Sequence, residues 1–341
     1  MRRLSAGVVL AALAMGAVVS SRAQQAPPET FRAATDLIQL DVSVLDSDRM
    51  PVRGLTAGDF TVLENGVARP VEAFAAVDLP DRICTGAAWL RNVAPDVVSN
   101  RRDTQRVVLI LLDDAMTPWD PGVLKFSRTI AQTVVNELGP ADLAGVVYTS
   151  ARRNGQELTT DRVRLMAAVE RFVPIGPTPI PGRFSAARAR GPMPGVSGPR
   201  GECPRQRCLT DALRNAAEIL TGWPGARKTI VLVGASAPGF SGTMDDALLI
   251  DDLGRTFAAM QRANLNVYQF DPRGLEVDRR ITEQFGIFAE NTGGWAVTDT
   301  NAPWEAVPQV FRENSSYYLL GFRPVDPRQD GRFRKVSVQV S

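Results

Sequence analysis

From residue 106 onward the sequence alternates apolar segments with amphipathic ones, and this alternation restricts the possible folds more than any other feature. Residues 107–112 form a continuous aliphatic run, as is typical of a strand buried on both faces of a parallel sheet. Residues 123–138 are amphipathic and end at a Gly-Pro pair, which predicts a helix followed by a turn. Residues 143–148 are the next apolar strand. Repeated strand–helix order predicts an α/β fold with a doubly wound, mostly parallel sheet.

The same alternation predicts the remaining elements of this region. The expected helices cover residues 160–172, 210–220, 246–263, 279–292 and 304–314, and the expected strands cover residues 229–233, 266–270 and 317–322. Residues 174–202 are rich in Pro, Gly and Arg without a core-forming pattern, so we expect a long loop there. In a sheet of this kind, a ligand site belongs at the carboxyl ends of the strands.

Shorter strands are expected on either side of this region. Apolar and polar residues alternate over residues 37–45, and Asn65-Gly66 supplies the two residues of a tight hairpin turn. Residues 34–78 are therefore expected to form a small β module. Residues 79–103 show little periodicity and are expected to connect this module to the α/β domain at residues 104–315. A terminal β segment is expected over residues 316–341.

The first 23 residues have the pattern of a signal peptide. Arg2 and Arg3 precede an apolar run over residues 6–19, and a small-x-small cleavage site ends at Ala23. We therefore expect the chain to be exported to the periplasm, the cell envelope or the medium. The apolar run is shorter than the about 20 residues that span a bilayer, so we expect no transmembrane segment in the mature chain, residues 24–341.

The absence of histidine limits the chemistry that the chain can perform. None of its 341 residues is histidine, which excludes a Ser-His-Asp triad, a Cys-His dyad, a His-ligated zinc ion and a histidine general base. Removal of the signal peptide leaves 36 basic and 37 acidic residues, so the charge balance does not indicate a nucleic-acid partner. We expect a protein that binds a partner and is not an enzyme.

The three cysteines favour one small disulfide loop. Cys203 and Cys208 lie close together in a loop-like stretch, and an exported chain reaches an oxidising compartment. A disulfide between these two residues leaves Cys84 single. The sequence does not fix the connectivity, because Cys84 could instead pair with either of the other two.

Several motifs of this sequence occur together in one known family. They are residues 54–60 (Gly-Leu-Thr-Ala-Gly-Asp-Phe), 64–66 (Glu-Asn-Gly), 266–275 (Asn-Val-Tyr-Gln-Phe-Asp-Pro-Arg-Gly-Leu), 292–294 (Thr-Gly-Gly), 317–322 (Tyr-Tyr-Leu-Leu-Gly-Phe) and 330–336 (Asp-Gly-Arg-Phe-Arg-Lys-Val). With these motifs the chain resembles the bacterial proteins related to the von Willebrand factor type A domain, of the acidobacterial type. The resemblance implies a Rossmann-like type A domain with β structure before and after it. It also implies binding of a protein or another extracellular ligand.

The resemblance further implies a place for a divalent cation. Type A domains hold Mg²⁺ or Mn²⁺ with Asp-x-Ser-x-Ser after the first strand, and with a Thr and an Asp from later loops. Asp113 and Thr117 match this motif, whereas Ala115 removes one hydroxyl and residues 234–236 offer no carboxylate. Asp114 or Asp120 could supply a further oxygen ligand. The alternative is that Asp113 accepts backbone hydrogen bonds within its own loop and fixes the turn.

Two other functions are compatible with parts of the sequence. A strand that ends in Asp113-x-Ala115-x-Thr117 is similar to the nucleophile loop of haloacid dehalogenase-type phosphotransferases, but Ala115 replaces their general acid. An envelope scaffold that binds other proteins without a metal ion is the remaining alternative. Of these alternatives, we expect a binding protein with a degenerate metal site. If this site holds Mg²⁺ or Mn²⁺, Asp113 and Thr117 are the expected ligands.

Overall fold

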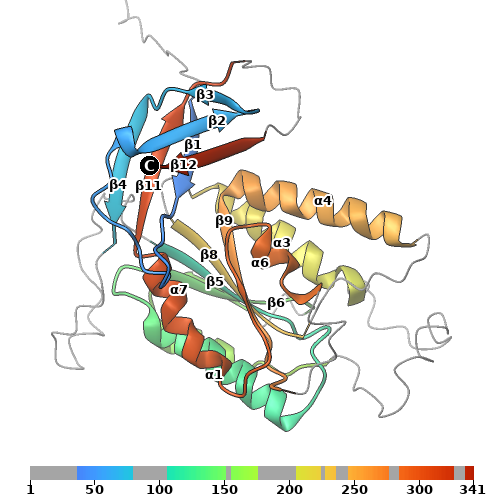
Figure 1. The fold of residues 1–341 in the computed structure, drawn as a ribbon. Helices are drawn as coiled ribbons and strands as arrows, with labels where there is room; N and C mark the ends of the chain where they lie inside the picture. Colours follow the sequence, from blue (N-terminus) through green and yellow to red (C-terminus); the bar gives the residue numbers. More distant parts are fainter. Residues whose placement is uncertain are drawn as a thin grey trace, which may run out of the picture. The chain divides into compact units, whose positions relative to one another are not determined.

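The computed structural model describes eight stretches of the chain (Figure 1): residues 37–79, 106–150, 155–175, 205–223, 227–235, 245–275, 284–325 and 335–341. The expected signal peptide, almost all of the expected connector and nearly the whole expected long loop lie outside these residues. Within the described residues, no helix is both long enough and apolar enough to cross a membrane.

A six-stranded sheet with helices packed against it forms the larger part of the described chain (Figure 1). Its strand order is β10-β9-β8-β5-β6-β7, and every neighbouring pair is parallel except β6 and β7. The strands are β5 (Arg106–Leu112), β6 (Leu143–Tyr148), β7 (Gln156–Thr159), β8 (Arg227–Val233), β9 (Leu265–Phe270) and β10 (Ala296–Val297). The predicted α/β class with a mostly parallel sheet is therefore confirmed.

Helices cover both faces of this sheet (Figure 1). The helices are α1 (Pro121–Glu137), α2 (Arg162–Glu170), α3 (Arg205–Thr221), α4 (Asp245–Ala263), α6 (Ile287–Glu290) and α7 (Val307–Glu313). All seven residues of β5 are buried, because both faces of the sheet are covered. Successive side chains of β5 alternate between two cores, one beneath α1, α2 and α7 and the other beneath α3 and α4. The aliphatic run in the sequence thus marks the centre of the sheet.

A second β structure combines strands from both ends of the described chain. Its two antiparallel sheets have the orders β1-β11-β4 and β12-β2-β3. The strands are β1 (Ile38–Val42), β2 (Phe60–Glu64), β3 (Val67–Arg69), β4 (Ala73–Asp78), β11 (Ser316–Phe322) and β12 (Val336–Val340). Asn65 (φ 51°) and Gly66 (φ 83°) form the hairpin turn between β2 and β3. The N-terminal and C-terminal β segments therefore share one core, which includes Phe60 and Tyr318.

The structure differs from the sequence prediction at several places. Strand β10 was not predicted, and the helix expected over residues 279–292 corresponds within the described residues to the short α6. Strand β7 is an unpredicted strand of the sheet, because its sequence Gln-Glu-Leu-Thr is polar and carries no buried-strand pattern. The helix expected over residues 304–314 is divided into a 3-10 turn (Pro303–Ala306) and α7, with a proline at the start of each. Proline lacks the N–H that would continue the first helix, and its fixed φ suits the first turn of the next.

Candidate functional site

The candidate site lies where parallel strands β5, β6 and β8 end, which we call the carboxyl edge. Strand β5 lies between the other two, and the last residues of the three strands are in register. Asp113 and Asp114 follow β5, Thr149 follows β6, and Gly234 follows β8. The parallel pairing therefore brings together residues that lie up to 121 positions apart in the sequence.

Asp113 is fully buried in this edge and holds its loop in place. Its Oδ1 accepts hydrogen bonds from Thr149 Oγ1 at 2.7 Å and from the Met116 amide at 3.3 Å. Its own amide donates to the Val233 carbonyl at 2.9 Å. Burial raises the pKa of Asp113 to about 6, although the hydrogen bonds from Thr149 and Met116 act in the opposite direction.

Asp114 joins the ends of two strands and the segment after α2. Its Oδ1 accepts from the Ser150 amide at 2.8 Å and from Thr149 Oγ1 at 3.0 Å, and its Oδ2 accepts from Ser150 Oγ at 2.5 Å. Its carbonyl accepts from the Ile175 amide at 2.8 Å. Thr149 carries one hydroxyl proton, so Asp113 and Asp114 share it. Both carboxylate oxygens of Asp114 are therefore engaged in structural hydrogen bonds.

Thr117 and Asp113 face the same short stretch of backbone after β8. Thr117 Oγ1 accepts from the Ala235 amide at 3.2 Å. A Cβ atom added to Gly234 would lie 3.2 Å from Thr117 Oγ1, 3.2 Å from Asp113 Oδ2 and only 2.4 Å from Asp113 Cβ. The structure thus brings the two predicted metal ligands together around Gly234, and the close approach of the backbone explains why this position is glycine.

Asp120, the other residue considered as a metal ligand, has a different role. Its Oδ1 accepts from the amides of Gly122 at 2.7 Å and Val123 at 3.1 Å, so it is the N-cap of α1. Thr210 of α3 is the threonine that lies close to the place expected for the later-loop Thr of such a site, and its hydroxyl donates to Asp252 of α4. Neither side chain supplies an oxygen beside Asp113 and Thr117.

These residues fit a divalent-cation site poorly. Among the described residues, no group of three or more His, Cys, Asp and Glu side chains could hold a metal ion. Asp113 Oδ2 and Thr117 Oγ1 are two of the three atoms nearest to a Cβ built on Gly234, and both oxygens of Asp114 already accept hydrogen bonds. Mg²⁺ requires near-octahedral oxygen coordination, most of which would have to come from water or from a partner here. The hydrogen bonds fit the alternative role, in which Asp113 fixes its own loop.

The loop after β9 contains an ion pair that the sequence did not reveal as such. Asp271 is buried, and the Arg273 guanidinium binds it at 2.6 Å from Nη2 to Oδ2 and 2.9 Å from Nε to Oδ1. Gly274 has φ 81°, and the Leu275 amide donates to Asn301 Oδ1. The sequence signal was the motif Asp-Pro-Arg-Gly, whose spacing does not show that its charged residues bind each other.

Large apolar side chains are exposed around this edge, and we call them the apolar rim. Each of the five is 50–62% exposed: Trp119, Ile175, Leu248, Ile250 and Leu275. Trp119 lies between β5 and α1, Leu275 follows β9, and the Ile175 amide is bonded to Asp114. Leu248 and Ile250 belong to the first turns of α4. The last residue of α4, Ala263, lies at the opposite edge of the sheet, where its carbonyl accepts a hydrogen bond from Lys228 at the start of β8, so the first turns lie toward the carboxyl edge.

The predicted disulfide falls only partly within the described residues. Cys208 lies on α3 with 1% of its surface exposed. Cys203 and Cys84 lie outside the residues that the structure describes. The pairing of Cys203 with Cys208 therefore stays a prediction.

Comparison with known proteins gives distant structural likenesses. No family model and no curated protein matches the chain. The PilB minor pilin from Streptococcus sanguinis is similar with a TM-score of 0.37 and 11% identity, covering 62% of this chain and 62% of the pilin chain. The TFIIH p34 N-terminal domain has a TM-score of 0.34 and 10% identity, covering 61% of this chain and 99% of that domain. The chain thus spans less than two thirds of the pilin, and neither likeness bears on function.

Proposed function

We propose that this protein is an exported, non-catalytic binding protein with a type A-like domain, and that it binds a protein or another extracellular ligand through the carboxyl edge. The observation that carries the proposal is the apolar rim. Five large exposed apolar side chains around one edge favour an interaction surface there, because a partner that covers them removes apolar area from water. In open parallel sheets this edge is also where ligands bind.

The hydrogen bonds beneath the rim support binding over catalysis. Asp113 and Asp114 are both buried, and both oxygens of Asp114 accept hydrogen bonds from Thr149 and Ser150, so neither carboxylate is exposed to a substrate. A phosphotransferase would need a proton carrier at position 115, where Ala115 is buried and cannot titrate. The same network fixes the loops of three strands, which lowers the entropy lost when a partner binds.

Site-specific photo-crosslinking in the cells that produce the protein tests this proposal. A photoreactive residue at Trp119 is expected to capture a partner, whereas one at Val163 is the matched control. Val163 is 72% exposed but lies in the first turn of α2, near the opposite edge. Equal capture at both positions, or capture only at Val163, would contradict a binding site at the carboxyl edge.

A metal-dependent adhesion site is the second candidate, favoured by the meeting of Asp113 and Thr117 at Gly234. Chelation of divalent ions separates the two candidates. Crosslinks from position 119 that persist in a chelator indicate a metal-independent surface. Crosslinks that disappear in the chelator and return with Mg²⁺ indicate adhesion through a bound ion.

A further inference from the structure

Strand β12 leaves one edge of its sheet open. It pairs with β2 and with no other described strand (Figure 1). At its two ends, the Lys335 carbonyl accepts from the Asn65 amide at 2.8 Å, and the Ser341 amide donates to the Asp59 carbonyl at 3.1 Å. Odd-numbered residues therefore direct their backbone groups toward β2, because these groups alternate in direction along an antiparallel strand. The even-numbered residues, which are the three valines of the strand, direct their N–H and C=O groups toward the open edge.

β12 is also the least protected of the six edge strands in the described sheets. Strand β10 has only two residues, and the other four edge strands each contain a charged residue: Asp41 in β1, Arg69 in β3, Asp78 in β4 and Glu157 in β7. Short strands and charged side chains are common means by which sheet edges avoid pairing with another chain. β12 has five residues, Val-Ser-Val-Gln-Val, without a charge or a proline. Its edge is therefore suited to accept a further strand.

The sequence of β12 reads almost the same in both directions, which suits pairing with a second copy of itself. In an antiparallel pair centred on Val338, this residue faces Val338 of the second copy, and Val336 faces Val340 on either side. All of these residues direct their backbone groups outward, so each facing pair exchanges two backbone hydrogen bonds. On the exposed face, Ser337 lies opposite Gln339, and the two side chains can bond to each other.

The ends of this pairing and its inner face also fit a second copy. Lys335 would lie opposite Ser341, so the two lysines are at opposite ends of the paired strands and do not repel each other at close range. Val336 and Val338 pack against the core of the β structure. Val340 is 42% exposed, and pairing would place it beside Val336 of the second copy and remove apolar area from water. Two three-stranded sheets would thus become one continuous sheet of order β3-β2-β12-β12-β2-β3.

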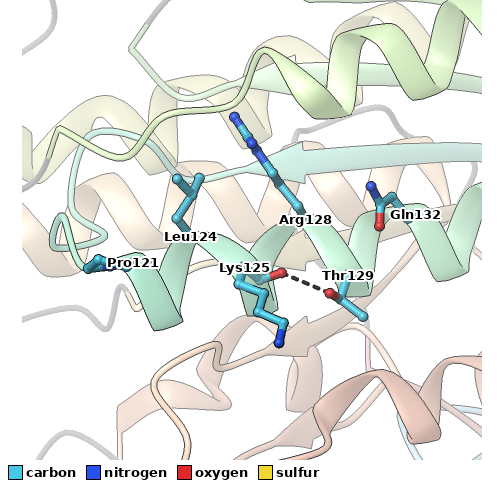
Figure 2. A pocket seen from close by; sticks show the side chains of 6 residues that line it. All are labelled: Pro121, Leu124, Lys125, Arg128, Thr129 and Gln132. Atoms are coloured by element: carbon cyan, nitrogen blue, oxygen red, sulfur yellow. Dashed lines mark hydrogen bonds between the residues drawn. The ribbon is translucent and has the colours of Figure 1, made fainter.

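The hollow along α1 presents fewer open groups than this edge. Figure 2 shows the six side chains that line it, which come from one helix. Arg128 already donates to the Phe172 carbonyl and pairs with Glu170. The Thr129 hydroxyl donates to the Lys125 carbonyl of the preceding turn. The hollow is therefore a solvated helix surface, and β12 offers the better-defined interface.

We propose that this protein self-associates through the open edge of β12, as a two-fold symmetric dimer in which the two β12 strands pair antiparallel. The occupant of the edge is a second copy of the chain, because the strand is complementary to itself in residue type, charge and backbone direction. The dimer does not depend on the function proposed for the carboxyl edge, since no residue of β12 belongs to the apolar rim. It would carry two carboxyl edges and could bind a repetitive ligand with increased avidity.

Analytical ultracentrifugation of residues 24–341 tests the dimer at concentrations up to about 1 mM. A reversible monomer–dimer equilibrium is expected, since a single pair of short strands makes a small interface. Two double variants at the exposed positions then test the register. Ser337→Lys with Gln339→Lys places like charges opposite each other and is expected to weaken the dimer by about tenfold. Ser337→Lys with Gln339→Glu is the matched control, which places opposite charges together and is expected to keep the dissociation constant within about threefold.

A mixing experiment gives a second measure of the same register. The double-lysine variant is mixed in equal amounts with a variant that has Ser337→Glu and Gln339→Glu, and heterodimers are expected although neither variant dimerises well alone. The absence of a dimer of the unchanged protein at about 1 mM would overturn the proposal. Equal dimerisation of the two lysine-containing variants, whether kept or lost, would also overturn it. Thermal unfolding of each variant confirms that the fold is kept, and a dimer through the apolar rim would respond to Trp119→Ser instead.

Discussion

Glu313 Oε1 lies 2.5 Å from Nε of Arg49, although the two residues are 264 positions apart. Glu313 belongs to α7 and is buried, whereas Arg49 follows β1 and is half exposed. The Arg49 guanidinium also lies over the Trp295 ring, 5.8 Å from its centroid. The Glu313 carboxylate further accepts from Trp295 Nε1 at 2.9 Å and Gln309 Nε2 at 3.1 Å. This cluster connects the β structure to the α/β sheet and its helices.

Replacing Glu313 is expected to destabilise the protein. Glu313→Gln removes the charge that binds Arg49 and leaves the guanidinium facing a neutral group, at a cost of about 1–3 kcal/mol in the free energy of unfolding. Urea unfolding followed by circular dichroism measures the change. Arg323→Gln is the control, because its ion pair with Glu72 is largely exposed and such pairs contribute less than about 1 kcal/mol. Equal losses in both variants would show that the cluster has no special role.

Gly234→Ala tests the close approach of the β8 loop to Asp113. The added Cβ would lie 2.4 Å from Asp113 Cβ, so the loops must separate, and we expect a loss of about 1–3 kcal/mol in the free energy of unfolding. Gly254→Ala in α4 is the matched control, since a Cβ there meets nothing within 4 Å. Alanine is a better helix former than glycine, so the control is expected to gain about 0.5–1 kcal/mol. A neutral Gly234→Ala would mean that the loops are loosely packed.

The buried carboxyl of Asp113 is expected to make stability depend on pH. The folded pKa of about 6 exceeds the ordinary aspartate value of 3.8, so the folded state binds the proton more tightly than the unfolded state. This contribution to stability is fully present below pH 3.8 and is lost as the pH rises through 6. Between pH 7.5 and pH 5 the protein should therefore gain about 1 kcal/mol relative to Asp113→Asn. Parallel pH profiles of unfolding for the two proteins would contradict this assignment.

Titration calorimetry with Mg²⁺ and Mn²⁺ tests the metal site directly. We expect no saturable binding to residues 24–341 up to millimolar metal, because two side-chain oxygens are too few for these ions. Asp113→Ala should give the same heats as the unchanged protein. Saturable binding that Asp113→Ala abolishes would instead establish metal-dependent adhesion.

Local patterns in the sequence predicted the strands that are buried along their whole length and the elements that end at turn-forming residues such as Asn-Gly. The aliphatic run of β5 predicted a central strand, and Asn65-Gly66 predicted the β2–β3 turn. The sequence also placed Asp113 and Thr117 at the end of the first strand of the α/β region. These inferences succeed because burial of a segment sets its periodicity, and because turn residues are selected by their own backbone angles.

Only the tertiary structure decided how distant segments meet. It placed β11 between β1 and β4, added the polar strand β7 to the sheet edge, and paired Arg49 with Glu313. It also engaged both carboxylate oxygens of Asp114 in hydrogen bonds, so a residue that the sequence offered as a metal ligand has a structural role. The partners of a polar side chain depend on which strands pack side by side. Periodicity along one segment does not predict that packing, because it reflects only which face of the segment is buried.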